Sequence, residues 1–201
     1  MVFGLFARKS SLTLIDAIHG EIMAQARQSA FYSEYGVPDT LEGRFEMVAL
    51  HGALAVRRLT QLPQPGPDMA QELIDAIFRH FDVALREIGV GDLTVPKRMK
   101  NLAAGFLGRA RSYLATIDGP GRENLTQALA RNVFGLGESE EKPETSAERL
   151  RESGAVRLAV YVRALEAAYA GANLREFLAG KVPAVDPAAI AVLPAGHGSA
   201  A

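Results

Sequence analysis

A short turn between two helical patterns is the feature that most constrains the fold of this chain. Across residues 74–88 apolar side chains recur every three or four positions, which places them on one helix face that must be buried. Gly89 and Gly91 then offer the positive φ angles that end a helix, and Pro96 presets the first turn of the next one. The sequence therefore predicts a helical hairpin over residues 76–113.

The second half of this hairpin is strongly basic. Residues 93–117 contain no acidic side chain, although the whole chain has a formal net charge of -1. The basic residues are Lys97, Arg98, Lys100, Arg109 and Arg111. An apolar stripe through Met99, Phe106 and Tyr113 leaves them mostly on the exposed side of the helix. Two interpretations stay open: a solvated face that keeps the protein in solution, or a surface that binds a partner.

The rest of the chain is also predicted to be helical, in an all-α, single-domain bundle of six or seven helices. Helix starts are indicated by Ser10 or Ser11, Asp39 or Thr40, Pro67, Pro96, Thr145 with Glu148 as a capping box, and Asn173, and the apolar pattern from Leu125 indicates a further helix that ends near Phe134. The segment Gly119 to Gly121 breaks the chain, and no stretch shows the sustained alternation of a strand. The expected divisions are an N-terminal segment (1–9), a helical domain (10–180) and a flexible tail rich in proline and alanine (181–201).

The termini and the composition bear on location. Residues 1–9 are expected to pack as an extended segment on the domain surface or to touch a membrane as a short anchor. No apolar window approaches the ~20 residues that a spanning helix needs. The basic pair follows the apolar run, the reverse of a secretory signal, and there is no cysteine. A cytoplasmic protein is expected, with peripheral contact to the inner membrane as an open alternative.

The sequence gives no catalytic signature and predicts a protein that is not an enzyme. His51 lies within a helical pattern but has no carboxylate at helical spacing, so we interpret it as a hydrogen-bonded structural residue. His80 likewise lacks an acidic partner three or four residues away, and Asp16 with His19 supplies too few ligands for a metal. No metal and no cofactor are expected. The aromatic segment 29–38, which includes Tyr35, is interpreted as cover for the core, with contact to a partner as the alternative.

Four stretches carry a resemblance to a known family. VGDLTVPKRMK (90–100) followed by GFLGRARSY (105–113) closely resembles the ubiquinol-cytochrome c chaperone family in its alphaproteobacterial form. DAIFRHFDVALREIG (75–89) and YGVPDTLEGRFEMVALHGALAVRRL (35–59) match the same family. The resemblance runs from about residue 35 to 134, and VPKRMK (95–100) is its most specific part.

The resemblance implies an assembly chaperone that binds newly made cytochrome b and promotes assembly of respiratory complex III. The candidate partner-binding residues are Tyr35, Arg44, His51, Asp92, Lys97, Arg98, Lys100, Arg109, Arg111 and Tyr113. A ribosome or a small partner chaperone are further candidate partners, whereas the nearly neutral charge gives no reason to expect DNA. Two other classes stay open: an RNA- or ribosome-associated binding module, supported only by the basic helix, and a helical-bundle enzyme, for which the sequence offers no site.

Overall fold

The chain is an all-α bundle. A computed structural model describes residues 3–87, 89–119, 124–136 and 146–190, with the helix path alone for 3–11 and 146–150. The described helices are α1 (Phe3–Ala26), α2 (Ser29–Ser33), α3 (Leu41–Gln61), α4 (Gly66–Glu87), α5 (Val95–Asp118), α6 (Leu125–Phe134), α7 (Ser146–Gly171), α8 (Leu174–Leu178) and the 3₁₀ helix η1 (Pro187–Ala189). No strand occurs in these ranges, so the predicted fold class is confirmed.

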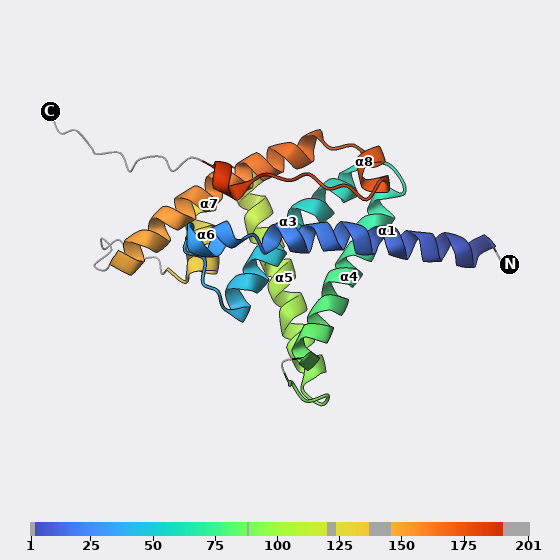
Figure 1. Cartoon of the computed structure of the whole chain (residues 1–201), viewed down its shortest axis with the longest axis horizontal. Coiled ribbons are helices and arrows are strands. Elements are labelled where there is room, and N and C mark those ends of the chain that lie inside the picture. The colour runs from blue at the N-terminus through green and yellow to red at the C-terminus, as the bar shows by residue number, and fades with distance from the viewer. Residues whose placement is uncertain (1–2, 88, 120–123, 137–145, 191–201) are drawn as a thin grey trace.

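The predicted hairpin is formed by α4 and α5. Gly89 has a φ of 83°, which lies in the left-handed region that glycine tolerates, and Pro96 lies in the first turn of α5. Gly91 does not adopt a positive φ, contrary to expectation, because one left-handed residue suffices to end α4. In Figure 1 the turn between the two helices is the tip of an arm that projects from the rest of the bundle.

Helix α3 is the centre of the bundle. It packs against α1, α4, α5, α6 and α7, and its middle is buried all round from Met47 to Ala55. Thr40 caps it by accepting a hydrogen bond from the backbone N–H of Gly43 at 3.2 Å, as predicted. Asn173 and Glu176 form a reciprocal capping box at the start of α8. The predicted cap at Thr145 falls outside the described residues.

Two N-terminal expectations were wrong. The first helix begins at Phe3 rather than near Ser10, so the backbone of residues 3–9 continues α1 instead of forming a separate extended segment. Those residues contain no proline, and helix propagation costs little once a helix has been nucleated. The segment after α1 also forms an unpredicted helix, the five-residue α2, which buries Phe31.

The C-terminal segment is packed rather than flexible as far as Ile190. The hydroxyl of buried Tyr35 donates to the backbone carbonyl of Pro187 at 2.7 Å. Arg157 of α7 lies over the Tyr35 ring, 4.2 Å from its centroid, and its guanidinium bonds Glu34 at 3.0 Å. Composition suggested an exposed tail because it cannot show that a tyrosine and an arginine distant in sequence hold the segment. The segment up to Ile190 therefore packs on the helical domain, and the division of the chain at residue 180 stays a prediction.

Candidate binding groove

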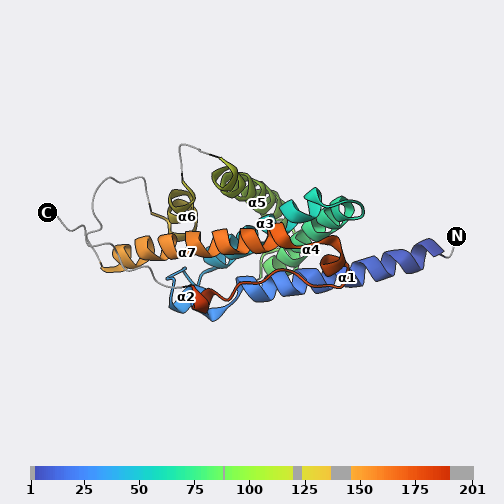
Figure 2. The same ribbon diagram turned by 90° about the horizontal axis from the view of Figure 1, so that it is seen from above.

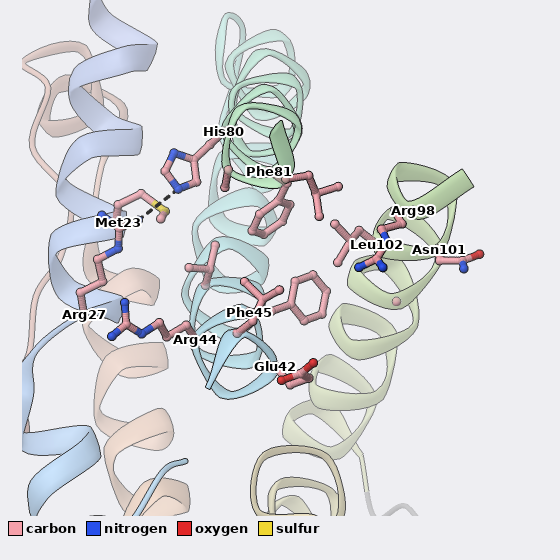
Figure 3. Close-up of a pocket in the computed structure, with 15 residues that line it drawn as sticks. Met23, Arg27, Glu42, Arg44, Phe45, His80, Phe81, Arg98, Asn101 and Leu102 are labelled. Atoms are coloured by element: carbon pink, nitrogen blue, oxygen red, sulfur yellow. Dashed lines mark hydrogen bonds between the residues drawn. The ribbon is translucent and has the colours of Figure 1, made fainter. Parts of the chain in front are cut away.

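A groove of about 540 Å³ opens where α1, α3, α4 and α5 meet. Figure 3 shows its aromatic floor, where Phe45 of α3 and Phe81 of α4 lie with ring centroids 5.3 Å apart. The other apolar lining residues are Met23, Leu41, Val48, Ala84, Leu85 and Leu102. Leu41 at the start of α3 is 51% exposed, which is unusual for a leucine beside an apolar cavity. The groove thus offers an apolar surface that is open to a ligand or a partner segment.

Arginines dominate the charge around the groove. Arg27, Arg44 and Arg98 line it, against one carboxylate, that of Glu42. Arg27 donates to Nε2 of His80 at 3.1 Å, and Arg44 pairs with Asp39 at 2.7 Å. Burial lowers the pKa of His80, and the neighbouring Arg27 guanidinium lowers it further. Arg98 forms no ion pair with any described residue, so its charge faces the groove uncompensated.

Three more predicted cations lie on the outer face of α5. Lys97, Lys100 and Arg111 are exposed, and none of them forms a salt bridge with a residue in the described part of the chain. Asp92, in the turn before α5, is exposed and paired with Arg86 of α4. The predicted basic face therefore exists on the exposed side of α5, next to the groove. Arg98 and Asn101 lie at the border between this face and the groove.

Three of the predicted contact residues are buried. Tyr35 and His51 are both 0% exposed, and Tyr113 is almost as fully enclosed. His51 Nδ1 lies 2.7 Å from the Met47 carbonyl, and Nε2 lies 2.8 Å from the Tyr161 hydroxyl. A neutral imidazole that donates from Nδ1 and accepts at Nε2 satisfies both groups. These side chains support the bundle, as interpreted for His51, and cannot reach a partner in this structure.

Arg109 also serves the interior. Its Nε donates to both carboxylate oxygens of Glu46, at 2.8 and 2.9 Å, and the Tyr113 hydroxyl donates to the same carboxylate at 3.0 Å. Burial raises the pKa of Glu46, while Arg109 and Tyr113 act in the opposite direction. Arg109 holds this buried carboxylate, so the prediction that it faces a partner is not supported. Its partner lies 63 residues earlier, and no spacing rule reveals such a pair.

Neither a metal site nor a helix that could span a membrane occurs among the described residues. No group of three or more histidine, cysteine, aspartate or glutamate side chains within them could hold a metal ion. The rings of His19 and His80 approach to 5.4 Å between centroids, but no third side chain of these types completes a metal site with them among the described residues. Within the described chain, no helix combines the length and the apolar character that crossing a membrane requires.

The chain is similar to known proteins both in sequence and in structure. The family model described as ubiquinol-cytochrome C chaperone matches residues 33–185, well over half of the chain. The chain belongs to the ubiquinol-cytochrome c chaperone family. The crystal structure of the Cbp3 homolog from Brucella abortus is similar to 95% of this chain and 100% of that one, with 34% identity and a TM-score of 0.76. A search of curated proteins gave no match.

The family model matches a longer part of the chain than the motifs that resemble the family. That resemblance ended near Phe134, at the end of α6, whereas the matched region continues through α7, α8 and the packed segment up to residue 185. The extension agrees with the structure, in which α7 packs against α6 and α3. Three walls of the groove, from α3, α4 and α5, lie within the matched region. The fourth wall, with Met23 of α1 and Arg27 in the turn after it, precedes that region.

Proposed function

We propose that this chaperone binds newly made cytochrome b through the groove and promotes assembly of ubiquinol-cytochrome c reductase, respiratory complex III. The observation that carries the proposal is an open apolar groove walled largely by the family-matched helices. A membrane protein that has not yet assembled exposes apolar helix faces, which a groove between helices can cover. The role requires binding and release, and it assigns no catalytic step to the chain.

The dimensions of the groove favour a short segment of the client. Its volume of about 540 Å³ is comparable with small-ligand pockets, roughly 300 to 1,000 Å³. Such a space accommodates the side chains of one helix face rather than a whole client. Arg98 at the edge would meet an acidic side chain or the carboxyl end of that helix, where the dipole is negative. We therefore propose that the client segment is apolar along one face and negative at one end.

The test compares two leucine variants with similar exposure. Leu41→Glu places a charge on the groove, and position 41 begins α3, where a carboxylate is favourable for the helix dipole. Leu178→Glu places the same charge on α8, at a residue that does not line the groove. Each tagged variant is purified from membranes of its host, and the associated b-type cytochrome is measured by its haem absorbance. We expect Leu41→Glu to capture several-fold less cytochrome b and to lower the complex III level, and Leu178→Glu to behave as wild type.

If both variants captured the same amount of cytochrome b, the groove would not be the site that binds the client. Absence of a b-type cytochrome from the wild-type preparation, with intact complex III in a strain lacking the protein, would reject the functional proposal itself. Thermal unfolding of both variants serves as the control for folding.

A further inference from the structure

The outer face of α5 is a continuous basic surface. Positions along it follow helical spacing, and the residues are Lys97, Lys100, Ala104, Leu107, Gly108, Arg111 and Ala115, all exposed. Lys97 and Arg111 are separated by about 21 Å along the axis at 1.5 Å per residue. Figure 2 shows α5 along the edge of the bundle, on the opposite side from α1. No other described helix covers this face.

The charge on this face lacks compensation. Lys97, Lys100 and Arg111 form no salt bridge with any residue that the structure describes. The carboxylates that bracket α5 are already engaged, Asp92 with Arg86 and Asp118 with Arg57. Lys97 and Lys100 also lie in the first turns of the helix, where the dipole disfavours cations. Helix stability therefore gives no reason for a cation at these positions.

Exposed leucines accompany the cations. Leu107 is 56% exposed between Lys100 and Arg111, and Leu93, in the turn before α5, is 98% exposed. Between these side chains lie Ala104 and Gly108, which are small, so a flat surface could come close to the helix backbone there. Lysine and arginine without acidic neighbours, combined with apolar side chains that reach outward, suit the interface of an anionic bilayer.

We propose that the outer face of α5 and the tip of the α4–α5 hairpin bind an anionic lipid bilayer, with Leu93 entering the headgroup region. Arg98 and Asn101, on the adjacent quarter of α5, line the groove. A bundle docked in this way has the groove opening sideways at the membrane surface. The proposal goes beyond client binding, and it is tested without any client.

Vesicle flotation measures the binding. Vesicles contain equal parts of phosphatidylcholine and phosphatidylglycerol, or phosphatidylcholine alone. The triple variant Lys97→Gln, Lys100→Gln, Arg111→Gln is compared with the matched triple Arg151→Gln, Arg175→Gln, Lys181→Gln, which removes the same charge from exposed positions on other elements. We expect wild type to bind only the anionic vesicles, with weakening by salt. The α5 triple should bind roughly a hundredfold more weakly and the matched triple within a few-fold of wild type.

A fluorescence measurement tests the depth of contact. The chain contains no tryptophan, so Leu93→Trp introduces a unique reporter at the tip and Leu178→Trp a control on α8. We expect anionic vesicles to shift the emission of Leu93→Trp to the blue and to leave that of Leu178→Trp unchanged. Equal weakening of the two triple variants, an unshifted Leu93→Trp signal on bound vesicles, or binding to RNA but not to vesicles would overturn the proposal.

Discussion

Arg109 and Arg111 lie two residues apart on α5 but have different environments. Arg109 bonds the buried carboxylate of Glu46, whereas Arg111 is exposed on the outer face. In the sequence both belong to one basic run, because helical spacing shows which positions share a face but not which distant residue meets them. In the structure Arg109 pairs with a buried carboxylate, whereas Arg111 is exposed and makes no salt bridge with a described residue.

Replacement of these two arginines should therefore have unequal effects. Arg109→Gln leaves the Glu46 carboxylate without its guanidinium, and we expect a loss of about 1 to 3 kcal/mol in the free energy of unfolding, moderated by partial solvent access. Arg111→Gln should change it by less than about 0.5 kcal/mol. Urea unfolding of both variants measures the difference. Equal stabilities would mean that the Glu46 carboxylate is not held by Arg109.

His51 should make stability depend on pH. Burial lowers the pKa of His51 to about 4 from 6.5. Between these values the unfolded chain binds a proton that the folded chain does not, so stability is full above pH 6.5 and falls as the pH drops toward 4. The loss amounts to roughly 3 kcal/mol at 1.36 kcal/mol per pKa unit.

Urea unfolding of wild type and His51→Gln at pH 7.5 and pH 4.5 tests this contribution. Burial also lowers the pKa of His19 and His80, which contribute with the same sign in both proteins. The difference between the two pH dependences therefore isolates His51. We expect the variant to lose less stability on acidification than wild type, and parallel curves would contradict the assignment.

At the scale of elements, local signals in the sequence predicted most helices. Caps such as Thr40 and Asn173 and breakers such as Gly89 act within a few residues, so their effects are readable without the fold. The five-residue α2 carries no such cap, since Gln28 makes no side-chain hydrogen bond, and it was missed. The packed segment after α8 was missed because tertiary contacts hold it. Local chemistry is sufficient for long helices and for a short helix with a cap, such as α8, and insufficient for short elements without one.

Helix α7 contains a close approach that a methyl group would disrupt. A Cβ at Gly154 would lie 1.9 Å from the Tyr35 carbonyl oxygen, which belongs to the backbone and cannot turn aside. We expect Gly154→Ala to lower the free energy of unfolding by about 1 to 3 kcal/mol or more. Gly20→Ala in α1, with no atom within 4 Å of the new methyl group, should instead be stabilising by up to about 1 kcal/mol. Thermal unfolding of the two variants is followed by circular dichroism. Similar Tm values would argue against tight packing of α7 on the backbone at Tyr35.

At the scale of the whole molecule, the segment 181–190 contacts both α7 and the residues just before α3. The Tyr35 hydroxyl and the Arg157 guanidinium both reach the carbonyl of Pro187. A chain ended after Gly180 would leave the buried hydroxyl without its acceptor, at a cost of roughly 1 to 3 kcal/mol. A chain ended after Ile190 keeps that acceptor and is the matched control. We expect a lower Tm for the shorter chain alone, and equal Tm values would show that the segment does not contribute to stability.

The groove is also a property of the whole molecule, which is why the sequence did not reveal it. Its floor residues Phe45 and Phe81 belong to apolar stripes that the sequence could only assign to a core. The groove exists only because four helices pack together and their side chains leave a space between them. A sequence pattern does not show how well side chains from different helices fill such a space. Among the predicted contact residues only Arg44 and Arg98 line it.

Helix α1 supplies one wall of the groove and precedes the residues that the family model matches. Met23 and Arg27 line the groove but precede the matched residues 33–185. Met23 is buried and α1 packs on α3 and α4, so this wall is part of the bundle. Because these residues border the groove, we expect α1 to contribute to the preference of each family member for its own client. Exchange of α1 between two family members, with each host's cytochrome b as the measured client, would show whether that helix carries the preference.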